Sequence, residues 1–308
     1  MTAAAHLALV GPTASGKSAL ALAAAQALAD VEIVSLDSMQ VYRGMDIGTA
    51  KPSPDERARV PHHLIDVADR ADDWSVARTQ AGARAAVAEI EARGRRALLV
   101  GGTGLYVQAV VDDLHIPGED LALRAQLEAE TAAPGGLAAA YTELERCDPV
   151  GASRIDPGNG RRIVRALEVI RLTGERFSSF GPGVTAFGPT AFPVRMAGVW
   201  LPRDVLSRRI ARRFAAMRDR GLVDEVRGLA GGPLSRTARQ AIGYKEVLAH
   251  LDGAEASLEA ALETAVRRTR AFARRQRMWF RRDPRVVWFG ASENPCTVLP
   301  ALLATWSR

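Results

Sequence analysis

The sequence predicts an α/β fold in which a parallel sheet of the P-loop NTPase type carries helices on both faces. The first observation is the segment GPTASGKS at residues 11–18, a complete match to the pattern G-x-x-x-x-G-K-[ST]. The second is that apolar, strand-like runs alternate with helical stretches, which is typical of a parallel sheet. The third is that polar or glycine-rich loops follow these runs, where parallel sheets bind their ligands.

The elements of this first part are expected in the following order. An apolar run precedes the glycine loop and an Ala- and Leu-rich stretch follows it, so a buried strand should lead through the loop into a helix. The expected strands are 6–10, 31–38 and 97–100, and the expected helices are 18–29, 74–93 and 105–111. Because parallel strands end at one edge, loops 11–18, 37–40 and 101–104 should converge on one cleft.

Strand signals stop after residue 117 and resume at 192–201. The block between them is helical in pattern, and its last helix is amphipathic, with Ile163 and Leu167 on the apolar side. The helices expected here are 119–132, 136–146 and 161–173. We therefore expect an inserted all-helical subdomain at 116–188. The P-loop core would comprise 1–115 and 189–308, with a helical, basic C-terminal part at 202–285 and a short strand-like run at 285–289.

The bulk composition excludes several classes of protein. A chain of 308 residues with 47% hydrophobic content can bury a core without disulfides or a structural metal. Its two cysteines, Cys147 and Cys296, belong to no C-x-x-C or Cys/His cluster, which argues against structural zinc. No apolar run is long enough to span a membrane and no secretory pattern is present, so the sequence predicts a cytoplasmic protein.

Positive charge is concentrated in the C-terminal third. The whole chain has a formal charge of +6, whereas residues 201–285 hold 20 Lys or Arg against 10 Asp or Glu. Residues 267–282 contain eight arginines and no acid, together with Phe272, Trp279 and Phe280. Such a field attracts a polyanion, so we expect these arginines to contact phosphates and the aromatic side chains to pack in the core. Arginine is abundant throughout the chain, and charge alone leaves a solvated helix face equally open.

The P-loop predicts a site for a diphosphate or polyphosphate. A strand, a glycine loop and a helix point several backbone N–H groups at one place, with the positive end of the helix dipole behind them. Lys17 adds a point charge for the terminal phosphates, and the hydroxyl of Ser18 can bind Mg²⁺. The expected phosphate-binding residues are Gly11, Pro12, Thr13, Ala14, Ser15, Gly16, Lys17 and Ser18.

Asp37 closes the strand that follows the P-loop helix, where a carboxylate can reach a ligand beside the phosphates. There it could accept a proton from a nucleophile or hold Mg²⁺ through water. Aspartates followed by serine also occur as turn or N-cap residues, and position alone leaves both interpretations open.

Six segments in this order and spacing resemble the bacterial tRNA dimethylallyltransferases, which are also called tRNA isopentenyltransferases. Besides the P-loop they are DSMQVYRGMDIGTAKP at 37–52, PHHLIDV at 61–67, LLVGGTGLY at 98–106, RRIVRALEVIRLTG at 161–174 and QAIGYKE at 240–246. The P-loop is shared by many unrelated enzymes, whereas the combination is specific. The resemblance extends over essentially the whole chain.

The resemblance implies transfer of a dimethylallyl group from dimethylallyl diphosphate to the exocyclic amine of the adenosine 3′-adjacent to the anticodon in tRNA. The P-loop, with Mg²⁺ on Ser18, would stabilise the departing diphosphate. Asp37 would take the proton of the amine, whose lone pair is delocalised into the ring. Arg209 matches an arginine that lies near the diphosphate in this family. Because Arg208 is adjacent, the assignment is open to a shift of one residue. The implied catalytic residues are Asp37, Lys17, Ser18 and Arg209.

The resemblance also implies that a stem–loop RNA presents a flipped base to the site. The loop after Asp37, the GGTG turn and two helical segments would contact the RNA. The implied tRNA-binding residues are Asp37, Ser38, Met39, Gln40, Thr103, Arg124, Arg161, Arg162, Ile163, Val164, Arg165, Ala241, Ile242, Gly243, Tyr244, Lys245 and Glu246. The implied partners are a tRNA anticodon stem–loop and dimethylallyl diphosphate, and the protein is expected to act as a monomer.

Three other functions are compatible with a P-loop. A small-molecule kinase also places an acid after the second strand, but it does not require the positive C-terminal third. A prenyltransferase acting on free adenine nucleotides would require neither the inserted helices nor the basic region. An ATPase or RNA-binding module without transfer chemistry would not require Asp37 beside the phosphates. ATP binding at the P-loop also stays open.

Overall fold

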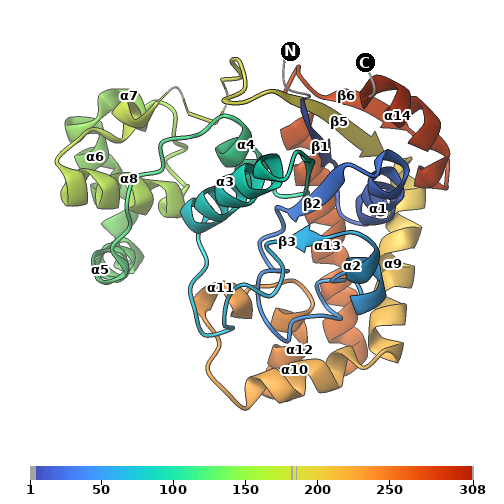
Figure 1. The fold of residues 1–308 in the computed structure, drawn as a ribbon. Coiled ribbons are helices and arrows are strands. Elements are labelled where there is room, and N and C mark those ends of the chain that lie inside the picture. Colours follow the sequence, from blue (N-terminus) through green and yellow to red (C-terminus); the bar gives the residue numbers. More distant parts are fainter. Residues whose placement is uncertain (1–4, 182, 185, 307–308) are drawn as a thin grey trace. The chain divides into compact units, whose positions relative to one another are not determined.

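A six-stranded parallel sheet forms the core of the larger of two compact units, which comprise residues 1–113 with 187–308, and residues 114–186. The structure is a computed structural model that describes residues 5–181, 183–184 and 186–306. The strand order is β3-β2-β4-β1-β5-β6, and every neighbouring pair is parallel (Figure 1). The strands are β1 (His6–Val10), β2 (Val31–Ser35), β3 (His62–His63), β4 (Arg96–Gly101), β5 (Val194–Trp200) and β6 (Val287–Gly290). This arrangement confirms the predicted fold class.

The register of the strands brings three loops together at the carboxyl edge of this sheet. Val10, the last residue of β1, pairs with Gly101 of β4 and Gly198 of β5, and Ser35 at the end of β2 pairs with Val100. Since β4 lies between β2 and β1, the loops that follow these three strands leave the same edge side by side. The predicted convergence of the P-loop, the Asp37 loop and the 101–104 turn follows directly from this order.

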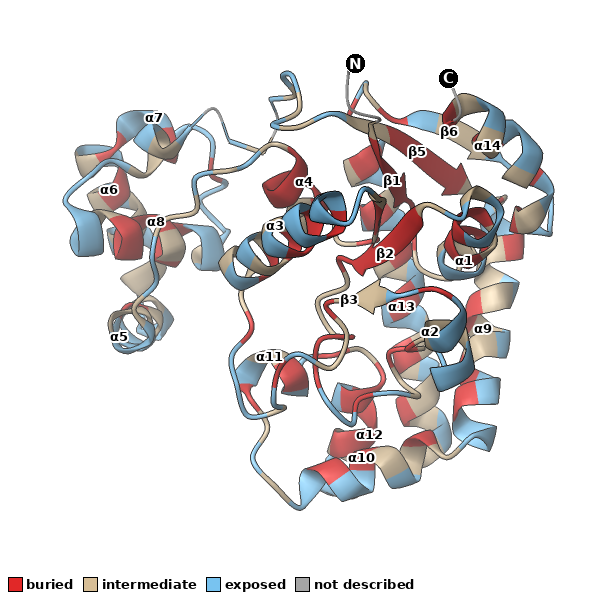
Figure 2. Ribbon diagram, in the orientation of Figure 1, coloured by how far each residue is buried: buried red, intermediate tan, exposed pale blue. Residues whose placement is uncertain are grey.

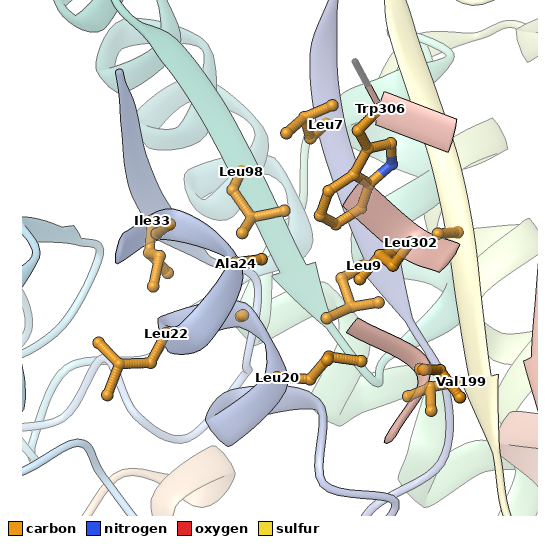
Figure 3. Close-up of a cluster of buried hydrophobic side chains, with 14 of the residues drawn as sticks. Leu7, Leu9, Leu20, Leu22, Ala24, Ile33, Leu98, Val199, Leu302 and Trp306 are labelled. Atoms are coloured by element: carbon orange, nitrogen blue, oxygen red, sulfur yellow. The ribbon is translucent and has the colours of Figure 1, made fainter. Parts of the chain in front are cut away.

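Alternating side chains of the strands pack on two layers of helices. Leu7 and Leu9 of β1 pack with α1 and α14 on one face (Figure 3), whereas Ala8 and Val10 pack with α3 and α4 on the other. The two-residue period of a strand produces this division, and burial of both faces explains why β1 is apolar throughout. Figure 2 shows β1, β2 and β5 largely buried, while α3 has a buried and an exposed side. The helices of these layers are α1 (Lys17–Leu28), α3 (Val76–Ala92), α4 (Gly104–Val111) and α14 (Leu299–Trp306).

The C-terminal part of this unit is helical, as predicted, and it packs around the long loop between β2 and α2. This segment, residues 36–53, is called the β2–α2 loop below. Val41 and Tyr42 of the loop share a buried cluster with Phe214 of α9, Val226 of α10 and Tyr244 of α12. The helices are α9 (Arg203–Asp219), α10 (Leu222–Ala230), α11 (Arg236–Arg239), α12 (Tyr244–Leu251) and α13 (Leu258–Phe280), and η2 (Pro295–Val298) is a 3₁₀ turn.

The aromatic residues of α13 differ in their environments. Phe280 is buried in the cluster on the α3 side of the sheet, and Trp279 is half-buried against the same cluster. Phe272 is half-buried as well, and the guanidinium of Arg275 lies 5.8 Å from its ring centroid. The expectation that these side chains pack in the core is therefore confirmed for Phe280 and Trp279, whereas Phe272 stands among the arginines.

Local capping chemistry determines where several helices begin. α2 (Pro54–Arg59) starts after Ser53, whose Oγ accepts the N–H of Glu56 at 3.2 Å. Glu56 in turn accepts the N–H of Ser53 at 2.8 Å, which completes a capping box. α13 begins after Ser257, whose Oγ accepts the N–H of Ala260 at 3.1 Å. Among the helices of the described chain, none combines the length and the apolar surface that crossing a bilayer requires.

The smaller unit, residues 114–186, is helical and has its own core. Leu127, Leu144 and Ile163 are buried in this core. The carboxylate of Glu168 is buried as well, and it accepts hydrogen bonds from Arg124 Nε at 3.0 Å and from Arg165 at 2.9 Å. Burial alone would raise the pKa of Glu168, but these hydrogen bonds hold it below its ordinary value. The helices are α5 (Leu121–Ala132), α6 (Gly136–Cys147), α7 (Pro149–Ala152) and α8 (Gly160–Thr173), and η1 (Phe177–Phe180) is a 3₁₀ turn.

Candidate active site

The P-loop packs tightly against two neighbouring segments. Gly11 has φ +149°, and a Cβ on it would lie 2.5 Å from the carbonyl oxygen of Val199. Gly16 has φ +86°, and a Cβ there would lie 2.2 Å from Pro295 Cγ. Backbone angle and close packing therefore both require glycine at these positions. The N–H groups that find no acceptor among the described residues, and can thus bind an anion, include those of Ala14, Gly16, Lys17 and Ser18.

The side chain of Lys17 folds back onto the P-loop. Its Nζ donates a hydrogen bond to the carbonyl oxygen of Pro12 at 2.8 Å. Burial lowers the pKa of Lys17 to about 8, although the charge of Asp37 acts in the opposite direction. A Cβ on Gly102 would lie 3.5 Å from Nζ, which places the 101–104 turn beside the lysine. An anion bound here would favour the charged form of Lys17.

Asp37 is oriented by its own turn. Its Oδ1 accepts the backbone N–H of Met39 at 2.9 Å and of Gln40 at 3.3 Å, so that β2 ends at Ser35 and not at residue 38 as expected. Its Oδ2 has no hydrogen-bond donor within the described chain. Ser38 and Met39 are half-buried beside it. The two interpretations of Asp37 are compatible, because one carboxylate oxygen holds the turn and the other is available to a ligand.

Gln40 is buried and holds the β2–α2 loop together. Its Oε1 accepts a hydrogen bond from Ser35 Oγ at 3.0 Å. Its Nε2 donates to the carbonyl oxygens of Thr49 and Ala50, each at 3.3 Å. The side chain of Gln40 is therefore engaged within the protein.

Helix α9 brings two arginines to the P-loop. Arg209 Nε donates to the carbonyl oxygen of Ala14 at 2.9 Å, and Arg213 Nη1 donates to Thr13 Oγ1 at 3.3 Å. Burial lowers the pKa of Arg213, whereas the charge of Asp37 opposes this shift. Asp37 is thus close enough to Lys17 of the P-loop and to Arg213 of α9 for its charge to affect the pKa of both.

The neighbouring Arg208 is directed elsewhere. It is exposed and pairs with Asp204 at 2.8 Å and with Glu293 at 3.8 Å. The structure therefore brings Arg209 to the P-loop and leaves Arg208 at the surface. Sequence reasoning missed Arg213, although its spacing of four residues from Arg209 on an expected helix indicates the same face.

A cleft of about 290 Å³ lies between α9 and residues 293–294, and one of its lining residues, Arg209, contacts the P-loop. Arg212, one of its lining residues, is exposed and forms no ion pair within the described chain. Glu293 and Asn294 form the wall opposite α9, and the next residue, Pro295, packs against Gly16. The lining residues are Val205, Arg208, Arg209, Arg212, Glu293 and Asn294. This cleft gives the P-loop a positively charged border.

The 101–104 turn and α13 close the site from another side. Thr103 is the N-cap residue of α4, and its hydroxyl forms no hydrogen bond within the described residues. Gln276 of α13 is buried and accepts the backbone N–H of Thr13 at 2.8 Å. A Cβ on Gly102 would lie 2.6 Å from Gln276 Nε2, so Gln276 bridges the P-loop and this turn. Sequence reasoning missed Gln276, because nothing local distinguishes it from its neighbours in the arginine-rich helix.

The 241–246 segment is not part of this cluster of side chains. Ala241 and Tyr244 are buried among the C-terminal helices. Glu246 is buried too, and it accepts the N–H of Gly243 at 2.7 Å and pairs with Arg268 at 2.5 Å. Ile242 is half-buried against the same cluster, whereas Lys245 is exposed.

The remaining sequence-predicted residues, Arg124 and 161–165, belong to the smaller unit. Ile163 and Val164 are buried in its core, and Arg124 and Arg165 hold Glu168. Arg161 and Arg162 are exposed at the start of α8. Within this unit, only the last two of these side chains are free to meet a polyanion.

The residues present fit a Mg²⁺ ion held mainly by its substrate. No group of three or more His, Cys, Asp or Glu in the described chain could hold a metal. Mg²⁺ commonly binds one or two protein groups together with substrate phosphates and water. The exposed Ser18 at the start of α1 supplies a hydroxyl of this kind, and a bound diphosphate would supply the phosphate oxygens.

Comparison with known proteins identifies the family of the chain. Residues 40–283 match the family model described as IPP transferase. A tRNA dimethylallyltransferase of Salinispora arenicola is 52% identical over 93% of this chain and 82% of its own length. One of Kineococcus radiotolerans is 50% identical over 94% of this chain and 91% of its own.

Solved structures show the same fold. The tRNA isopentenylpyrophosphate transferase of Bacillus halodurans is 40% identical, with a TM-score of 0.72 over 98% of this chain and 95% of that chain. A eukaryotic dimethylallyltransferase acting on tRNA is 26% identical, with a TM-score of 0.75 over 93% of this chain and 74% of that chain. With a family match over most of its length and relatives this similar, the chain belongs to the IPP transferase family.

Proposed function

We propose that the chain transfers a dimethylallyl group from dimethylallyl diphosphate to the exocyclic amine of the adenosine 3′-adjacent to the anticodon in tRNA. The observation that carries this proposal is the meeting of a P-loop with free N–H donors and an aspartate with a free carboxylate oxygen. Membership of the IPP transferase family and the names of the relatives support the reaction class.

The donor half of the reaction would take place on the P-loop. As the bond between the allylic carbon and the diphosphate oxygen breaks, negative charge grows on the leaving group. The free N–H groups of Ala14 and Gly16, the ammonium of Lys17 and the guanidinium groups of Arg209 and Arg213, which contact the P-loop, would stabilise that charge. A bound Mg²⁺ would neutralise part of the diphosphate charge.

The acceptor half would take place at Asp37. The adenine amine forms a bond to the allylic carbon and loses a proton, and Asp37 Oδ2 is the acceptor that the turn leaves free. The unpartnered hydroxyl of Thr103 is available to hydrogen-bond the acceptor base. Proton, prenyl group and diphosphate are thereby all accounted for.

The acceptor RNA would be the anticodon stem–loop of a tRNA. The exposed cations among the sequence-predicted residues, Arg161, Arg162 and Lys245, are suited to contact its phosphates. The positive charge of α13 adds a polyanion-attracting surface. We propose that the protein acts as a monomer.

A transfer assay with labelled dimethylallyl diphosphate and Mg²⁺ tests this function. The acceptors are unmodified anticodon stem–loop RNA, free AMP and no acceptor. Wild type should label the RNA, and Asp37→Asn, which keeps the shape of the turn, should lower the rate by about 10²–10⁴-fold. Asp252→Asn, at an exposed aspartate outside the site, is the matched control. Label in AMP alone would indicate a nucleotide prenyltransferase, and ATP consumption with small hydroxyl compounds would indicate a kinase.

A further inference from the structure

The β2–α2 loop has an anchor away from Asp37, the carboxylate of Glu225 in α10. It accepts the backbone N–H groups of Asp46 at 3.0 Å, Ile47 at 2.7 Å and Gly48 at 3.2 Å. Tyr244 of α12 donates its hydroxyl to the same carboxylate at 2.5 Å. The donors are successive backbone dipoles and one phenol, an arrangement that stabilises a carboxylate without a cation.

The ring of Tyr244 packs directly on the loop. A Cβ on Gly48 would lie 2.3 Å from Tyr244 Cε2, so only glycine permits this approach. Tyr244 is 2% exposed, which leaves its hydroxyl no route to a ligand in this conformation. Burial raises the pKa of Tyr244 and Glu225 raises it further, so the phenol remains a hydrogen-bond donor.

Hydrogen bonds connect this anchor to Asp37. The carbonyl oxygens of Thr49 and Ala50, which follow the anchored residues, accept from Gln40 Nε2. The backbone N–H of Gln40 donates to Asp37 Oδ1. The segment held by Glu225 thus holds Gln40, and Gln40 helps to fix the orientation of the Asp37 carboxylate.

We propose that Glu225 and Tyr244 are positioning residues. They fix the orientation of the Asp37 carboxylate through residues 46–50 and Gln40. The proposal rests on the proposed function, in which Asp37 accepts the proton. It reassigns Tyr244, which the family resemblance implies to be an RNA contact. Tyr244 acts through the β2–α2 loop, and the exposed Lys245 is the side chain of its segment that can reach RNA.

Steady-state kinetics of Tyr244→Phe, Glu225→Gln and the double variant test the proposal. Tyr244→Phe should lower kcat with the stem–loop RNA by about tenfold, since one hydrogen bond to a charged group is lost. Glu225→Gln should lower kcat further, because the glutamine amide would place its own N–H donors against the backbone N–H donors of residues 46–48. KM for dimethylallyl diphosphate should stay unchanged. The double variant should be no worse than Glu225→Gln, because both residues act through one loop.

The matched control is Tyr141→Phe, which removes a tyrosine hydroxyl that donates to Ala152 at 3.3 Å in the smaller unit. It should leave kcat with the RNA within about twofold. Equal losses of kcat in Tyr141→Phe and Tyr244→Phe would overturn the proposal, as would parallel changes in KM for the donor. A wild type that labels no RNA would instead refute the proposed function.

Amide hydrogen exchange provides a readout that does not depend on activity. In Tyr244→Phe and Glu225→Gln, exchange should become faster at residues 46–48 and also at Met39 and Gln40, whose N–H groups bind Asp37. Faster exchange at 46–48 alone would show that Glu225 and Tyr244 hold their own segment without reaching Asp37, and the proposal would fail.

Discussion

Burial of a single residue, Lys17, makes the phosphate site sensitive to pH. Its pKa of about 8 in the free protein means that part of the population carries a neutral amine at slightly alkaline pH. A diphosphate favours the charged form, so its binding near pH 8 should be accompanied by proton uptake. Lys17→Arg remains charged and should take up no proton at this position.

Calorimetry with inorganic diphosphate in two buffers of different ionisation enthalpy measures this uptake. Proton release from the ligand itself is the same for both proteins, so the difference between wild type and Lys17→Arg isolates the lysine. Equal uptake by the two proteins would contradict the prediction. Because the pKa of Lys17 is lowered in the folded state, stability should also rise with pH between about 8 and its ordinary value of 10.5.

The sequence revealed those site residues whose role is local. The P-loop and Asp37 stand in short segments in which a strand end, a glycine or a turn defines the position. Gln276 and Glu225 act on segments far away in the chain, on Thr13 and on residues 46–48, and no nearby pattern marks them. Such residues become visible only when the packing of α10 and α13 against the loops is known.

At the scale of elements, segments with a clear apolar or periodic pattern were predicted, including the short strand β6, whereas some elements without such a pattern were not. The predicted helix at 161–173 and strand at 6–10 correspond to α8 and β1 almost residue for residue. The two-residue strand β3 and the six-residue helix α2 give no periodicity to detect, although Ser53 and Glu56 carry the capping chemistry of α2. α14 was missed because its apolar sequence shows burial without indicating the kind of element.

Helix α9 illustrates what an element contributes that a motif does not. One face of it carries both Arg209 and Arg213 to the P-loop. Arg213→Ala should raise KM for dimethylallyl diphosphate and lower kcat, with a combined loss of about 10–100-fold, the value of a hydrogen bond to a charged group. Arg218→Ala, farther along the same helix, removes an exposed arginine paired with Asp219 and should change neither constant more than about twofold.

Kinetics of these two variants with a fixed RNA acceptor measure how much this face of α9 contributes to diphosphate binding and transfer. A loss in Arg213→Ala confined to KM for the RNA would show that the arginine serves the acceptor and not the diphosphate. Similar small effects in both variants would show that α9 provides only general positive charge.

At the scale of the whole molecule, the chain combines a precise small-molecule site with a diffuse positive surface. The candidate site contains half-buried or buried groups, among them Lys17, Arg213 and Gln276, that salt screens less than it screens exposed charges. The exposed arginines of α13, such as Arg274, have no acid near them in sequence and belong to the region that holds the charge excess of the chain. Donor binding and RNA binding should therefore differ in their response to ionic strength.

This difference predicts the behaviour of Arg274→Glu. If Arg274 neutralises an RNA phosphate, its replacement should reduce the slope of log affinity against log salt by about 0.7–0.9 and weaken RNA binding most at low salt. Affinity for inorganic diphosphate should be unaffected. Arg59→Glu, the same charge change on an exposed helix end, is the matched control. RNA affinities of both variants across a salt series decide the matter, because a bulk effect of net charge would reduce the slope equally in both, whereas a phosphate contact would do so only in Arg274→Glu.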